Sequence, residues 1–262
     1  MGTPAQTLTQ PLLKRGDKSA AVRQLQQLLT QRGYLLDPDG KFAGKTFQAV
    51  RAFQASHVDA EGHPLVVDGK VGPLTWWALT HPSANAAPSA VVDFVQMPPP
   101  EAGGSRLGRA ALQAAIGELK AGAGEVGGNN SGPFVLKYLQ PAGMPEGEAW
   151  CASFASWCYL QAAGTRTNMP FAYCPGARKL LQEFKDKGWA HAPGDSYQPL
   201  PGDLVFWWRV RADGWQGHVG FVYQLLDGRL YTVEGNKTPN VQGFSYVFTR
   251  MSQLLGYGHV PD

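Results

Sequence analysis

A segment without hydrophobic periodicity divides this chain of 262 residues into two parts. Residues 81–105 read HPSANAAPSAVVDFVQMPPPEAGGS, rich in Pro, Ala, Ser and Gly. Such a composition favours a semi-extended connector, because it offers no amphipathic face to bury. We therefore predict a helical module over residues 1–82, a linker over residues 83–105 and a larger domain over residues 106–262. The apolar patch at residues 91–95 within the linker is expected to dock onto one of the two.

Three short helices are predicted in the N-terminal module. Apolar residues recur at helical spacing in residues 19–32, where Ser19 is a plausible N-cap, and again in residues 44–56. A third helix is expected over residues 73–79, with a proline in its first turn. These helices would form a small three-helix bundle.

The same module contains an internal repeat. The turn DGKF at residues 39–42 recurs as DGKV at residues 68–71, and a threonine follows each aspartate by seven residues, at Thr46 and Thr75. An Asp-Gly turn that starts a helix explains this repeat as well as a ligand site does.

The larger domain changes from helical to strand-like patterns along its length. Helices are predicted at residues 107–121, 133–139, 150–163 and 176–187, and strands at residues 203–210, 217–226, 229–233 and 244–250. Asp227-Gly228 marks a hairpin between two of the strands. Helices packed on an antiparallel sheet make this an α+β domain.

Charge and composition exclude several classes of protein. Residues 1–82 hold 9 Lys and Arg against 6 Asp and Glu, whereas the remainder holds 14 of each, so no dense basic face suits nucleic acid. No apolar stretch is long enough to span a membrane, and the N-terminus lacks the apolar core of a signal peptide. We therefore expect synthesis in the cytoplasm without a signal peptide, no membrane insertion and a monomer. The odd number of cysteines, three, argues against a disulfide framework.

One of these cysteines stands where a nucleophile is favoured. In WCASFASWCYLQAAG, Cys151 occupies the first turn of a predicted helix. The unpaired amides of a helix N-terminus stabilise a thiolate. A cysteine in this position is more often a buried packing residue when nothing else accompanies it.

Two further motifs supply a base and its polar partners. His218 lies between glycines at the start of a predicted strand, in GHVG, where its ring would remain accessible as a general base requires. Glu234 and Asn236, in VEGN, face one side at the end of the next strand. The hairpin at residues 227–228 brings these residues beside His218, so a thiol, a base and an orienting group can meet.

Cys151, the GHVG histidine and the VEGN pair, in this order, resemble the CHAP family of papain-like cysteine amidases and peptidases over residues 107–261. The resemblance implies Cys151 as nucleophile, His218 as general base, Glu234 as the residue that orients the imidazole, and Asn236 as an auxiliary polar group. It also implies the papain-like α+β fold.

Residues 12–80 are similar to the peptidoglycan-binding modules attached to cell-wall hydrolases, in their GDKSAAVRQLQQLL opening and their DGKVGPLTWWAL close. Together the two resemblances imply a peptidoglycan hydrolase that cleaves an amide bond, either N-acetylmuramoyl-L-alanine or one within the stem peptide. It would act in the periplasm or cell wall of a target bacterium, as a phage lysin released through a holin or as an injected effector with an immunity protein. An inactive wall-binding protein and a cysteine acyltransferase of the same fold are the alternatives.

Three tryptophans near these motifs are candidate substrate-binding residues: Trp150, Trp207 and Trp208. Adjacent strand residues point to opposite faces, so one of the last two is expected in the core. The loop at residues 127–132 lacks the alternating aspartates of a calcium loop, so we predict no metal and no cofactor. That loop would instead line the cleft.

Overall fold

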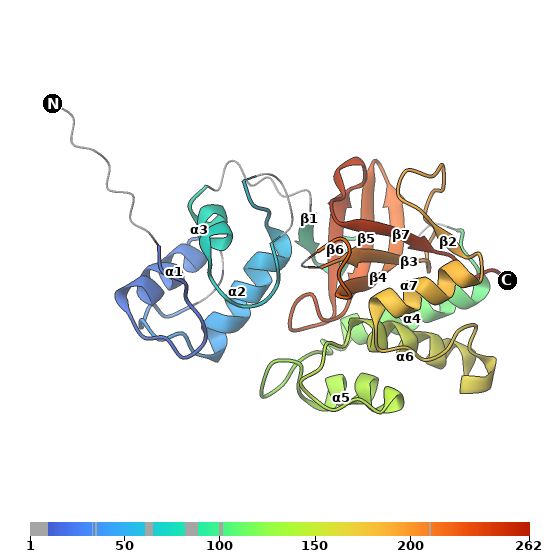
Figure 1. The fold of residues 1–262 in the computed structure, drawn as a ribbon, viewed down its shortest axis with the longest axis horizontal. Coiled ribbons are helices and arrows are strands. Elements are labelled where there is room, and N and C mark those ends of the chain that lie inside the picture. Colours follow the sequence, from blue (N-terminus) through green and yellow to red (C-terminus); the bar gives the residue numbers. More distant parts are fainter. Residues whose placement is uncertain are drawn as a thin grey trace. The chain divides into compact units, whose positions relative to one another are not determined.

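The N-terminal unit is built on three helices, as predicted. In the computed structural model, which describes residues 10–32, 34, 36–60, 65–81, 89–99, 102–209 and 211–262, the chain forms two units, Met1–Ala86 and Ala87–Asp262. The helices of the first unit are α1 (Ala20–Thr30), α2 (Gly44–Ser56) and α3 (Pro73–Thr80) (Figure 1). Gly33, which directly follows the residues predicted for the first helix and would end it, lies outside the described residues.

Local signals and a shared core explain these helices. The side-chain oxygen of Ser19 accepts a hydrogen bond from the amide of Val22, which caps α1, and Pro73 opens α3 where its missing N–H costs nothing. Apolar side chains from all three helices meet in one buried cluster, which includes Leu25, Leu29, Val50, Phe53, Trp76 and Leu79. Burial of this cluster holds the short helices together.

The second unit combines four helices with one antiparallel sheet in the described part of the chain, and the predicted α+β class is confirmed. The helices are α4 (Arg106–Lys120), α5 (Pro133–Leu139), α6 (Cys151–Ala163) and α7 (Ala177–Asp186). The strands are β1 (Ser89–Val92), β2 (Ala190–His191), β3 (Leu204–Trp208), β4 (Gly217–Leu226), β5 (Arg229–Glu234), β6 (Gln242–Val247) and β7 (Leu254–Gly258). Their order in the sheet is β1-β6-β5-β4-β3-β7-β2.

Three of these strands were not predicted. β1 lies within the segment expected to be a linker, where Val91 pairs with Phe244 of β6, so the sheet of the second unit begins inside that segment. β2 has two residues, and β7 contains Gly256 at φ +131°, a backbone conformation that a periodicity pattern does not reveal. Pairing with neighbouring strands, rather than their own patterns, defines these three segments.

The helices cover one face of the sheet. Figure 1 shows α4, α6 and α7 gathered on one side of it. Phe206, Val219, Phe221 and Val233 belong to the same buried cluster as the apolar residues of these helices. Side chains alternate along a strand, so residues such as His218 project toward the opposite face.

No helix in the described part of the chain is long and apolar enough to cross a membrane.

Candidate active site

Cys151 is the first residue of α6. Trp150 precedes the helix, and its carbonyl accepts a hydrogen bond from the amide of Phe154, which starts the helical ladder. The backbone amide of Val219 on β4, with those of Ala152 and Cys151, acts to lower the pKa of the Cys151 thiol. Because Val219 follows His218 directly, the packing of α6 against β4 brings Cys151 next to the strand that carries the histidine.

His218 is bonded to the carboxylate predicted to orient it. Its Nε2 lies 2.8 Å from Oε2 of Glu234. Strand pairing sets this contact: β4 and β5 are antiparallel neighbours, and Gly220 leaves room for the carboxylate, since a Cβ there would lie 2.5 Å from Cγ of Glu234. The second glycine of GHVG, Gly220, therefore makes room for the Glu234 side chain, a role that the sequence pattern did not suggest.

Glu234 is held by a buried network that sequence reasoning missed. Its Oε1 accepts hydrogen bonds from the hydroxyls of Thr232, at 2.6 Å, and Tyr246, at 2.5 Å. Lys237 donates from Nζ to the hydroxyl of Tyr246 and lies 4.0 Å from Oε2 of Glu234. Thr232 and Glu234 share a strand face at period two, which was a readable signal; Tyr246 comes from another strand and was not.

Asn236 braces the start of α6. Its Oδ1 accepts a hydrogen bond from the amide of Trp150 at 3.1 Å, and its Nδ2 donates to Oδ1 of Asn130 at 2.6 Å. Asn236 adopts φ +62° and Asn130 φ +53°, left-handed conformations that asparagine tolerates better than most residues. Asn236 therefore connects the end of β5 to the residue before Cys151 and to the loop at residues 127–132.

Burial dominates the electrostatics of the thiol. It raises the pKa of Cys151, and this outweighs the lowering by the Val219 amide, by the charge of Arg209 and by the amides at the helix start. The helix N-terminus alone therefore does not make Cys151 a thiolate at neutral pH, in contrast to the expectation from its position.

The imidazole is neutral for the same reason. Burial, together with the charge of Arg209, lowers the pKa of His218 to about 4, against the opposing effect of Glu234. Burial raises the pKa of Glu234, but Lys237 and His218 outweigh it and the pKa lies at about 2. At neutral pH the site holds a thiol, a neutral imidazole and a carboxylate.

Access to the reacting groups is narrow. Only 5% of Cys151 and 3% of His218 is exposed. Trp207 packs on the histidine, with ring centroids 5.6 Å apart, and on Tyr246 at 5.3 Å. Cys151 and His218 therefore expose little of their surface to solvent.

The predicted tryptophan contacts need correction at one position. Trp150 is fully buried, stacks on Tyr138 and donates from its indole to Glu125, so it packs the core and has no surface for a substrate. Trp207 is 5% exposed and lies against His218, while Trp208 is partly exposed. Both the ring and the indole N–H of Trp150 therefore have their contacts inside the domain.

Asp203, another buried acid of this unit, is engaged by other partners. Asp203 accepts a hydrogen bond from the amide of Leu200 at 2.8 Å and lies 2.7 Å from Nδ1 of His259. It therefore closes a turn.

Two family models match this sequence. The model of the CHAP domain matches residues 143–236, and the model of a putative peptidoglycan binding domain matches residues 18–79. The first range contains Cys151, His218, Glu234 and Asn236. Both resemblances inferred from the motifs are thereby confirmed. A comparison with curated proteins found no match.

Two solved structures are similar to parts of the chain. One is the crystal structure of Burkholderia AP3 phage endolysin, at 30% sequence identity, covering 47% of this chain and 41% of that chain, with a TM-score of 0.24. The other is the crystal structure of Ly7917 with the hydrolyzing product of MDP, at 16% identity, covering 59% of this chain and 62% of that chain, with a TM-score of 0.37. The chain therefore spans less than two thirds of either of those chains.

Proposed function

We propose that this chain, in which a peptidoglycan-binding domain precedes a CHAP domain, is a peptidoglycan hydrolase that cleaves an amide bond with Cys151 as its nucleophile. The first domain would hold the enzyme on the wall, and the second would carry out the reaction. The observation that carries this proposal is the position of Cys151 at the start of α6, beside the amide that follows the Glu234-bonded His218.

The reaction begins with a neutral pair. Nε2 of His218 is engaged by Glu234, so Nδ1 is the nitrogen that accepts the thiol proton as Sγ of Cys151 attacks the carbonyl carbon. The sulfur–carbon bond forms, and the imidazolium produced is stabilised by the ionised Glu234. The histidine then donates its proton to the leaving amine as the carbon–nitrogen bond breaks, which leaves a thioester.

Water completes the cycle. His218 accepts a proton from the water that attacks the thioester, and Cys151 leaves as the thiol. The amide at the start of α6 would stabilise the oxyanion in both steps, because the first amides of a helix have no partner within the helix. Asn236 supports this geometry by fixing the amide of Trp150, one residue before the nucleophile.

The test uses purified, dye-labelled peptidoglycan. Cys151→Ala should release no dye above background, while it sediments with the wall like the unaltered chain. Cys158→Ala is the matched control: it removes a buried thiol from the same helix and should retain turnover. Dye release by Cys151→Ala at the unaltered rate would overturn the proposal.

Mass spectrometry of the digest identifies the bond. New N-terminal L-Ala on released stems would identify an amidase, and new termini within the stem an endopeptidase. Products that carry an added amine in place of water would identify acyl transfer. The same digest therefore separates these reaction types.

A further inference from the structure

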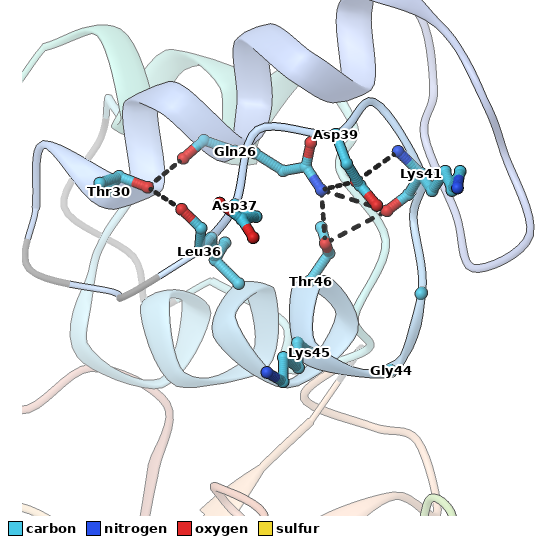
Figure 2. Close-up of a pocket in the computed structure, with 10 residues that line it drawn as sticks. Gln26, Thr30, Leu36, Asp37, Asp39, Lys41, Gly44, Lys45 and Thr46 are labelled. Atoms are coloured by element: carbon cyan, nitrogen blue, oxygen red, sulfur yellow. Dashed lines mark hydrogen bonds between the residues drawn. The ribbon is translucent and has the colours of Figure 1, made fainter.

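The repeat of the peptidoglycan-binding domain is a structural duplication built around two buried glutamines. Gln26 of the first copy donates from Nε2 to Oδ1 of Asp39 at 2.8 Å and to Oγ1 of Thr46 at 3.0 Å. Its Oε1 accepts the amide of Gly40 at 2.8 Å. One side chain thus ties the DGKF turn to the first turn of α2 (Figure 2).

The second copy repeats these contacts. Gln54 donates from Nε2 to Oδ1 of Asp68 at 3.0 Å and to Oγ1 of Thr75 at 3.2 Å, and its Oε1 accepts the amide of Gly69 at 2.9 Å. Both glutamines are 2% exposed. These contacts account for the recurring Asp, Gly and Thr as scaffold, so the repeat by itself identifies no ligand.

The two copies differ in what surrounds this scaffold. The first copy opens into a pocket of about 740 Å³, whose lining includes Asp37, Lys45 and the scaffold residues Gln26 and Thr46 (Figure 2). A pocket of this volume suits a ligand of several residues rather than an ion. At the positions equivalent to Asp37 and Lys45, the second copy carries Val66, which is 44% exposed, and Leu74, which is 56% exposed.

The charges at this pocket are available to a ligand. Within the part of the chain that the structure describes, the carboxylate of Asp37 and the ammonium of Lys45 form no hydrogen bond or ion pair, and both side chains are exposed. The scaffold does not need them, because the second copy folds around the same glutamine contacts with apolar residues in both places.

We infer that this pocket binds the peptide stem of peptidoglycan, with Lys45 contacting a stem carboxylate and Asp37 a stem ammonium. The inference rests on the proposed function, which makes peptidoglycan the ligand of this domain. A stem peptide with a diamino acid carries both charges on one short chain, whereas the uncharged sugars of the glycan would use neither side chain. Charge-assisted hydrogen bonds of this kind are stronger than neutral ones.

The test uses the full chain with Cys151→Ala, so that no substrate is cleaved. Calorimetry would measure binding of a synthetic stem tetrapeptide that has a free side-chain amine and a free C-terminal carboxylate. Lys45→Leu and Asp37→Val, which install the residues of the second copy, should each weaken binding about tenfold. Lys70→Leu, which removes an exposed lysine from the second copy, should leave the affinity unchanged. An uncharged disaccharide of N-acetylglucosamine should not bind the pocket.

Unchanged affinity in both pocket variants, or binding of the disaccharide that Lys45→Leu weakens, would overturn the inference. If Lys45→Leu does not fold, as judged by its thermal transition, Lys45→Gln removes the same charge and decides the matter. Sedimentation of the Cys151→Ala chain with whole wall sacculi distinguishes a failure of the proposed function from a failure of the pocket assignment. If this chain fails to sediment, the proposed function fails; if it sediments and the pocket variants bind the tetrapeptide normally, only the pocket assignment fails.

Discussion

Nε2 of His218 lies 2.8 Å from Oε2 of Glu234, and both side chains are withdrawn from solvent. In the proposed mechanism, this contact leaves Nδ1 for the proton of Cys151 and supplies the negative charge that an imidazolium needs.

Glu234→Gln should lower kcat/KM on purified peptidoglycan by roughly two to four orders of magnitude. The amide keeps the size of the side chain but removes the charge that stabilises the imidazolium. Binding to the wall should persist, because the first domain is unaltered. Glu148→Gln is the control and should be fully active, because Glu148 is exposed and lies before the start of α6. Full activity of Glu234→Gln would exclude Glu234 as the orienting residue.

Lys237→Met should lower activity about tenfold and shift the acid limb of the pH–rate profile to higher pH. The charge of Lys237 lowers the pKa of both His218 and Glu234, so its removal raises both. Methionine preserves packing against Phe244, over whose ring the ammonium lies at 4.1 Å. A profile of kcat/KM against pH measures the shift. An exposed lysine changed in the same way, Lys185→Met, should move neither value.

Stability should fall as the pH drops from about 6.5 toward 4. Burial lowers the pKa of His218 from an ordinary 6.5 to about 4, so in this range the unfolded chain binds a proton that the folded chain does not. The expected loss is about 3 kcal/mol of unfolding free energy over the whole range. Denaturant melts at several pH values measure it.

His218→Gln isolates this contribution. Burial also lowers the pKa of His57, which acts in the same direction, so the unaltered chain includes both effects. The variant should lose less stability between pH 6.5 and 4 than the unaltered chain. Equal slopes in the two chains would mean that His218 titrates normally in the folded state.

Gly235→Ala should destabilise the second unit by about 1–3 kcal/mol. A Cβ at this position would lie 2.4 Å from the indole of Trp150 and 3.0 Å from the ring of Phe154, and both rings are buried. Thermal unfolding measures the change. Gly117→Ala in α4 is the opposite case, because a Cβ there meets no atom within 4 Å. This substitution should raise the free energy of unfolding by roughly 0.5–1 kcal/mol. A higher Tm for Gly235→Ala would contradict the packing described.

Local signals in the sequence predicted most of the elements. Ser19 and Pro133 start helices, Gly164 ends one, and Asp227-Gly228 turns β4 into β5. Each of these acts through its own backbone preference or a nearby hydrogen bond, so it can be read without knowing the fold. The edge strand β1 was not predicted, because four residues with no strong pattern become a strand only when β6 lies beside them.

The motifs alone establish the types of chemical group at the candidate site and their order along the chain, because GHVG and VEGN fall on neighbouring strands of one hairpin. The protonation of these groups, in contrast, follows from the folded structure. The raised pKa of Cys151 and the lowered pKa of His218 come first from burial, which depends on every residue packed around them. The tertiary structure also places Lys237 and Tyr246 beside Glu234 and buries Trp150. Long-range packing sets these properties, and no local pattern records it.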